Sequence, residues 1–280
     1  MAEEDLKLER KDRILAVKDL PTLPKVLDEV SRLVKDPDSS TEQIAKLISM
    51  DQVLSAKVLK MVNSPIYGFP GRISSIHHAL VLLGFNVLRG VVVSTSVMDI
   101  MLQNMVGLWE HSVGCALASS TIARHVGLKD VEDISVAGLL HDLGKVVTAV
   151  QLPDLKAAVE ATVKEKDVSY LEAEKAVLGF GHDRVNAWIA DHWKLPPSIK
   201  EGISYHHKPQ LARLYPEAAC CVHLGDFMVR TFEYGSGGDD NVPYLEPEAL
   251  KKLKLRPADL EAILDKLSEQ FLDIADLSFV

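Results

Sequence analysis

His141 and Asp142 stand side by side at the end of an apolar stretch, "ISVAGLLHDLGKVV" (residues 134–147), and Lys145 follows one helical turn after His141. An imidazole, a carboxylate and an ammonium are thus brought together next to a segment whose apolar content suits a protein core. A polar group buried in a core needs a partner. The pair is therefore either a polar cap on a buried helix or part of a metal site.

Further residues of the types that bind metals occur in the same half of the chain. They are His111, His182, His206, His207 and Asp226, and each stands in or beside an apolar segment such as "SVGCALA" or "CVHLGDFM". One divalent cation can satisfy several buried imidazoles and carboxylates at once. A donor set of imidazole and carboxylate without thiolate suits iron or manganese, with zinc as an alternative.

The elements that would position these residues are helices. Apolar residues recur at helical spacing almost throughout, and no convincing alternating strand pattern occurs, which predicts an all-α fold. We expect an N-terminal helical lobe (residues 1–105), packed on a metal-binding lobe (residues 106–232). Residues 233–280 are expected to form a flexible loop, "EYGSGGDDNVP", followed by C-terminal helices.

Composition narrows the partners and the compartment. The chain has 280 residues and a net charge of −9, and this negative balance disfavours nucleic acid, whose phosphates are bound by Lys and Arg. The three cysteines include an adjacent pair, Cys220–Cys221, which is a poor disulfide framework and indicates a reducing cytoplasm. We expect Cys115 to be a small buried hydrophobe, although it stands one turn from His111.

We expect no membrane as partner. The first residues, "MAEEDLKLERKDR", are too charged for a signal peptide. The most apolar run, residues 87–107, is interrupted by Arg89 and Asp99 and by two serines, which is untypical of a bilayer span.

The N-terminal half carries several dispersed motifs. They are Leu-Pro-x-Leu-Pro at residues 20–24, Ile-Ser-x-Asp at 48–51, Asn-Ser-Pro at 63–65 and Leu-Leu-Gly at 82–84. Together they make the chain, over about residues 18–230, resemble an HDOD domain of the HD superfamily. The resemblance implies an all-helical fold and a regulatory role in bacterial signalling, in a family where many members have lost their metal ligands.

The histidines and aspartates resemble the signature of metal-dependent HD phosphohydrolases. With His182, His206 and His207 included, the set is similar to the extended set of the HD-GYP branch of that superfamily, the cyclic-dinucleotide phosphodiesterases. The resemblance implies two metal ions. His111, His141, Asp142 and Asp226 would hold the first ion, and Asp142 would bridge to a second ion held by His182, His206 and His207. Two such ions can hold phosphate oxygens and stabilise an in-line displacement. Lys145, which also matches that branch, would either reach a bound phosphate or be a solvated cation near a helix end.

One segment departs from the HD-GYP pattern. After its histidine pair that branch reads Glu and then Asp-Gly-x-Gly-Tyr-Pro, whereas this chain reads "HHKPQLARLYP". Lys208 replaces the Glu, and both glycines are missing, which removes a flexible loop. The departure speaks against cyclic-dinucleotide hydrolysis and leaves metal binding untouched.

Two functions remain open. The first, which the sequence favours slightly, is a signalling protein whose metal site is structural or sensory and whose partner is another signalling protein. The second is a phosphohydrolase or phosphodiesterase acting on a nucleotide, a cyclic dinucleotide or another phosphate-containing small molecule, with Asp142 and Lys145 as catalytic residues.

Overall fold

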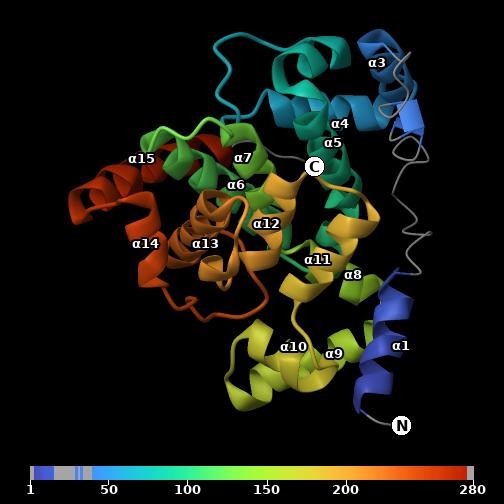
Figure 1. Cartoon of the computed structure of the whole chain (residues 1–280), viewed down its shortest axis with the longest axis vertical. Coiled ribbons are helices and arrows are strands. Elements are labelled where there is room, and N and C mark those ends of the chain that lie inside the picture. The colour runs from blue at the N-terminus through green and yellow to red at the C-terminus, as the bar shows by residue number, and fades with distance from the viewer. Residues whose placement is uncertain (1–2, 16–28, 31, 34–39, 276–280) are drawn as a thin grey trace.

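The computed structural model of the chain describes residues 3–15, 29–30, 32–33 and 40–275 (Figure 1). Helices, turns and loops account for this part of the chain, which contains no strand, so the all-α prediction is confirmed. The Leu-Pro-x-Leu-Pro motif at residues 20–24 lies outside the described residues.

The N-terminal half forms α1 (Glu3–Leu15), α3 (Thr41–Ser49), α4 (Gln52–Val62) and α5 (Ile76–Asn104). Local sequence explains where these helices start. Ser40 caps α3 and forms a capping box with Gln43, and Asp51 caps α4 by accepting the backbone N–H of Leu54. The side chain of Asn63 then exchanges hydrogen bonds with the backbone of Ile73, which closes the loop before α5.

The second half begins with α6 (Leu108–His125), α7 (Val131–Leu140), α8 (Leu143–Gln151), α9 (Pro153–Lys166) and α10 (Tyr170–Leu178). It continues with α11 (His182–His192), α12 (Pro197–Tyr205), the short 3-10 turn η2 (Pro209–Leu211) and α13 (Pro216–Thr231). The described part of the chain ends with α14 (Pro247–Leu253) and α15 (Pro257–Ala275).

The long helix α5 joins the two halves of the molecule. It contacts α3 and α4 and also the group formed by α6, α7 and α8, and it is kinked at Gly84, whose φ of 74° is a conformation that glycine adopts readily (Figure 1). By length and composition α5 could span a membrane, but 67% of its most apolar window is buried inside the protein. Its apolar character is therefore accounted for by its place in the core.

The helices around the predicted site pack very closely. The pairs α6–α7, α6–α13 and α12–α13 are in extensive contact, and a Cβ atom added to Gly138 of α7 would lie 2.8 Å from the backbone of α6. Likewise, a Cβ on Gly144 of α8 would lie 2.4 Å from the carbonyl oxygen of His182. Gly138 therefore lets α7 approach α6, and Gly144 lets the start of α8 approach the start of α11.

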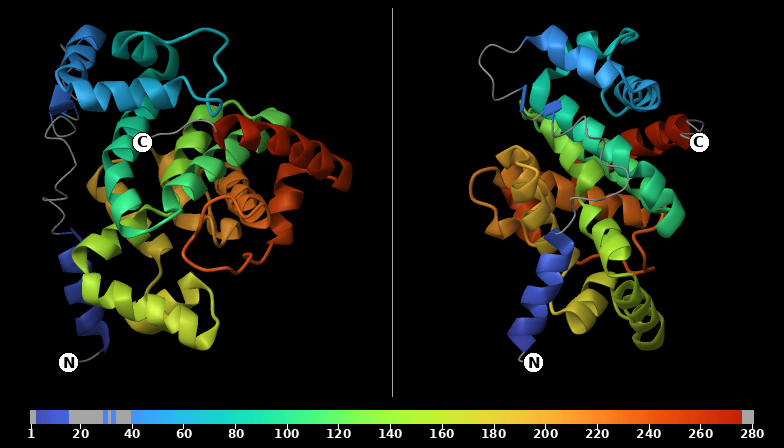
Figure 2. Two further views of the ribbon diagram at one scale, coloured as in Figure 1. Left: turned by 180° about the vertical axis from the view of Figure 1, so that it is seen from behind. Right: turned by 90° about the vertical axis from the view of Figure 1, so that its right-hand side faces the viewer.

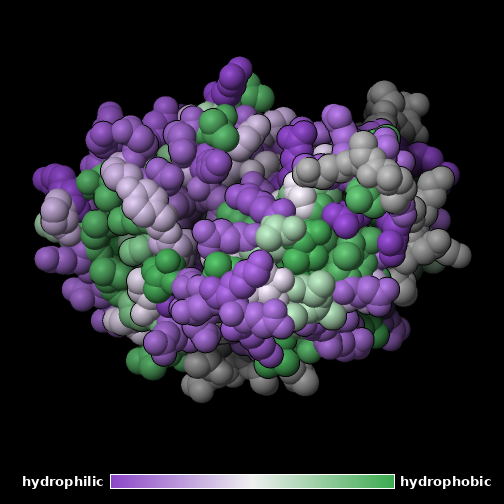
Figure 3. Space-filling view, turned by 90° about the horizontal axis from the view of Figure 1, so that it is seen from below, coloured by the Kyte–Doolittle hydropathy of each residue, from purple (hydrophilic) through white to green (hydrophobic). Residues whose placement is uncertain are grey.

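Helix α1 lies against α8 and α11, at the end of the molecule opposite α3 and α4 (Figure 2). Arg10 anchors it by donating hydrogen bonds to the carbonyl oxygens of Val177 and Leu178 at the end of α10. Seen from this end, hydrophilic side chains surround small groups of hydrophobic ones (Figure 3).

Candidate metal centre

Three of the predicted residues form a first cluster between α6, α7 and α13. The Nε2 atom of His111 lies 3.2 Å from Oδ1 of Asp226 and 3.1 Å from Nε2 of His141. His141 is the residue at which α7 ends, so the helix terminus directs its ring toward the side chains from α6 and α13. One donor atom from each of the three residues falls within 4.8 Å of the others.

Three histidines form a second cluster between α11 and the end of α12. His182 is the first residue of α11, and His206 and His207 follow the last residue of α12. The Nε2 atom of His182 lies 3.3 Å from Nε2 of His206 and 2.8 Å from Nε2 of His207.

Asp142 lies between the two clusters. Its Oδ1 atom is 3.2 Å from Nε2 of His182, while its Oδ2 atom is 3.4 Å from Nε2 of His141 and 3.6 Å from Nε2 of His111. Asp142 occupies the position before α8, yet its side chain makes no capping hydrogen bond. Asp142 is therefore not a cap of α8, because its carboxylate faces the imidazoles of His111, His141 and His182.

Hydrogen bonds on the far side of three rings determine where their lone pairs point. A carbonyl oxygen can only accept, so Nδ1–H of His141 donates to Gly138 O (2.7 Å) and Nδ1–H of His206 donates to Ile203 O (2.8 Å). His182 donates its Nδ1–H in the same way to Glu174, over 2.6 Å. In the neutral ring the Nε2 atom then carries a lone pair and no proton.

Burial disfavours the charged form of two of these rings, His141 and His206. His111, His141, Asp142, His182, His206 and Asp226 are each at most 6% exposed, and His207 is partly exposed. Burial lowers the pKa of His141 and that of His206. Burial alone would raise the pKa of Asp142 and Asp226, but the surrounding imidazoles, together with Lys145 beside Asp142, hold both well below the ordinary carboxyl range.

The centre therefore brings the Nε2 atoms of its imidazoles close to one another and to two carboxylates. The lone pairs of His182 and His206, 3.3 Å apart, repel each other unless a proton or a cation lies between them. This arrangement fits the donor set of a divalent metal site, with imidazole nitrogens and carboxylate oxygens and no thiolate.

Lys145 is buried and lies in the first turn of α8, so the alternative of a solvated cation near a helix end is wrong. Its Nζ atom is 2.7 Å from Oδ2 of Asp142 and donates to the carbonyl oxygen of Gly237 over 2.8 Å. The ammonium also lies 5.2 Å from the centre of the Tyr170 ring. In this structure Lys145 balances the charge of Asp142.

Sequence reasoning missed two buried polar residues that orient the ligand-type residues. Glu174 accepts hydrogen bonds from His182, and Asn186 donates to the carbonyl oxygens of His141 and Ile203 while accepting the N–H of Gly144 over 2.7 Å. A signal for Glu174 was available in the sequence. It shares a helical stripe with the apolar Tyr170 and Leu178, at intervals of four residues.

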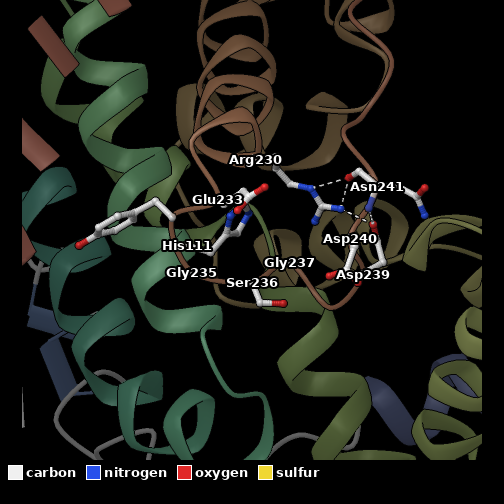
Figure 4. Close-up of a pocket in the computed structure, with 10 residues that line it drawn as sticks. His111, Arg230, Glu233, Gly235, Ser236, Gly237, Asp239, Asp240 and Asn241 are labelled. Carbon is white, nitrogen blue, oxygen red and sulfur yellow. Dashed lines mark hydrogen bonds and ion pairs between the residues drawn. The ribbon is translucent and has the colours of Figure 1, made fainter. Parts of the chain in front are cut away.

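The loop between α13 and α14 covers the first cluster. Residues 233–241, which we call the cover loop, line a cavity of about 340 Å³ together with His111 and Arg230 (Figure 4). The loop was expected to be flexible, yet it makes several hydrogen bonds. Ser236 N–H donates to Gly107 O, Arg230 pairs with Asp239, and Asp239 accepts the N–H of Tyr170.

The cysteines take no part in ligand-type clusters of the described residues. Cys115, Cys220 and Cys221 are all buried and free, as expected for small core residues, and burial raises the pKa of the Cys115 thiol well above its ordinary value.

Comparison with known proteins identifies the family. The HDOD domain profile matches residues 20–209, which is more than half of the chain. The chain belongs to the HDOD domain family. The resemblance inferred from the four dispersed motifs is thereby confirmed, whereas the likeness to the HD-GYP branch stays a prediction.

Solved structures share the whole architecture of this HDOD protein. An HDOD domain protein with unknown function from Geobacter sulfurreducens is 27% identical, with a TM-score of 0.68 and 96% of each chain covered. A candidate phosphohydrolase from Shewanella amazonensis SB2B is 22% identical, with a TM-score of 0.67 and 97% of each chain covered. At that level of identity the second likeness shows the fold alone.

Among curated proteins, an uncharacterized protein of Treponema pallidum is 26% identical over 219 residues, which is 76% of this chain. The match spans 43% of that relative's length.

Proposed function

We propose that this HDOD protein is a bacterial signalling protein whose buried His/Asp centre holds two divalent metal ions. His111, His141 and Asp226 would hold the first ion, His182, His206 and His207 the second, and Asp142 would bind both. The observation that carries the proposal is the convergence of the histidine Nε2 atoms on one another and on the two oxygens of Asp142, while the Nδ1 atoms of His141 and His206 are held by carbonyl oxygens. The donor types favour iron, with manganese or zinc as alternatives.

Two features support a signalling role over catalysis. Six of the seven proposed ligands are buried, and the cover loop lies over the first position. Lys145 already uses two of its three donors on Asp142 and Gly237, so it does not face an open phosphate site. A metal ion enclosed in this way suits a structural or sensory role. In such a role, metal occupancy or oxidation state changes the surface to which a partner protein binds.

We also propose a cytoplasmic location, because the three cysteines are free and buried. The partner would then be another signalling protein of the same compartment. Neither a membrane nor a nucleic acid is required by this function.

The alternative function is metal-dependent phosphohydrolysis, with Asp142 and Lys145 in catalytic roles. Its support is the partial exposure of His207, which gives the second position a side open to solvent. When bound there, two ions would supply charge that stabilises a phosphate undergoing in-line displacement. The substrate would be a phosphate-containing small molecule that displaces the Gly237 carbonyl from Lys145.

One anaerobic preparation tests both functions. Metal content is measured together with turnover of cyclic dinucleotides, mononucleotides and an aryl phosphodiester, for the wild type and for Asp142→Ala. Two metals per chain without turnover support the signalling role, and two metals with turnover that Asp142→Ala abolishes support the phosphohydrolase. A wild-type chain that neither contains nor takes up iron, manganese or zinc would refute the metal centre.

A further inference from the structure

We infer that Glu174 is a positioning residue that supplies the second metal position with a negative charge of its own. The inference rests on the proposed metal centre. It concerns the group that binds Nδ1 of His182, on the side of the ring away from the proposed ion. Glu174 lies on α10, outside the seven proposed ligands, and its side chain is fully buried.

One carboxylate oxygen of Glu174 holds His182 at two points. Oε2 accepts the backbone N–H of His182 over 2.8 Å and the ring Nδ1–H over 2.6 Å. These contacts settle both the rotation of the ring and its tautomer, so that Nε2 is aimed at Oδ1 of Asp142, 3.2 Å away. A carboxylate behind a ligating imidazole raises its basicity and its affinity for a metal.

His182 differs in this respect from the other rings whose outer partners are known. The outer partners of His141 and His206 are the neutral carbonyl groups of Gly138 and Ile203. Only for His182, among these three, is the outer partner an anion.

The charge balance of the two positions explains why an anion is needed there. The first position has Asp226 as a carboxylate of its own and shares Asp142, whereas the second has three histidines, no carboxylate of its own and its share of Asp142. Glu174 brings the second position to the same number of nearby carboxylates as the first. It does so through the imidazole of His182.

A purely structural role would have a different consequence. Because the carboxylate of Glu174 accepts the backbone N–H of His182, the first residue of α11, it also stabilises the start of that helix. This effect alone would be independent of any metal. The Oε1 atom of Glu174 is buried and has no hydrogen-bond partner among the described residues, which is costly for stability alone. A structural role predicts lower stability and unchanged metal affinity, whereas the positioning role predicts a loss confined to the second position.

The test is equilibrium dialysis of metal-free full-length protein against Fe²⁺ under anaerobic conditions. Glu174→Gln keeps the shape and an oxygen acceptor but removes the charge. Glu172→Gln is the matched control, because Glu172 is exposed on the same helix and hydrogen-bonds to the Ser169 cap, away from His182. We expect two ions for the wild type and the control, and for Glu174→Gln one ion of unchanged affinity and a second weakened about 10–100-fold.

The first position serves as the internal check on folding, because its ligands come from α6, α7 and α13. If Glu174→Gln does not fold, Glu174→Asp tests the same point, because it keeps the charge. It is expected to retain the second ion more tightly than any folded variant with an uncharged residue at position 174. Two ions of wild-type affinity in Glu174→Gln would overturn the inference and leave the metal centre intact. A wild-type chain that binds no ion would overturn both.

Discussion

Replacing Asp142 by asparagine should separate the charge-balancing role that this carboxylate has in the structure from its proposed role as a metal ligand. Asp142 neutralises the buried Lys145 at 2.7 Å, and its two oxygens lie next to histidines of both clusters, where it is proposed to bind both ions. Asparagine preserves its size and removes its charge. We therefore expect a loss of stability without metal and, in addition, a loss of the stabilisation that metal provides.

The first loss follows from burial. The side chains of Asp142 and Lys145 are 2% and 5% exposed, and removing one partner of such a buried ion pair costs roughly 3–5 kcal/mol. The chain offers a matched control in Lys57 and Asp99, which are also 2.7 Å apart but are 24% and 49% exposed. Asp99→Asn should therefore cost about 1 kcal/mol or less.

The second loss follows from linkage between binding and folding. A ligand present at 100 times its Kd stabilises the folded state by about 2.7 kcal/mol for each site, so two ions contribute about 5 kcal/mol. At about 2–4 °C per kcal/mol for a chain of this size class, chelation should lower the wild-type Tm by about 10–20 °C. Asp142→Asn should show the same Tm with and without metal.

Thermal and urea unfolding of the wild type, Asp142→Asn and Asp99→Asn, each with Fe²⁺ and with chelator, measure both losses. Two results would refute the reasoning. One is an Asp142→Asn protein that still gains stability from metal as the wild type does. The other is an equal loss of unfolding free energy in Asp142→Asn and Asp99→Asn, which would mean that burial does not make the Lys145–Asp142 ion pair more important for stability.

Three further predictions concern access, protonation and packing. Asp239→Asn, which weakens the anchoring of the cover loop, should speed the removal of metal by a colorimetric chelator with little change in equilibrium occupancy, and an unchanged rate would contradict a covering role. Because the pKa of His206 is lowered well below its ordinary value, the unfolded chain takes up a proton first as the pH falls below about 6.5. The metal-free protein should then lose about 1.4 kcal/mol per pH unit for this ring, as urea unfolding between pH 7 and pH 5 can check. Gly144→Ala should drive apart α8 and α11 and weaken the second ion in dialysis, whereas Gly71→Ala, with open space around it, should leave both ions in place.

The sequence by itself determined the helical fold, the family and the residue types of the centre. Helices follow from the local spacing of apolar residues. All seven proposed ligands can be named from the sequence, because their types and order match the set that the resemblance to the HD superfamily implies. Their assignment as ligands stays a prediction.

Only the tertiary structure decided how those residues are paired. Glu174 meets His182 across a turn, and Lys145 meets a carbonyl from residue 237, at a separation of 92 residues in the chain. No local pattern reports such contacts, because they depend on how closely α8, α10 and α11 approach. The same packing buries the rings, sets their tautomers and turns Asp142 inward, and these are the features that make a run of histidines into a candidate metal centre.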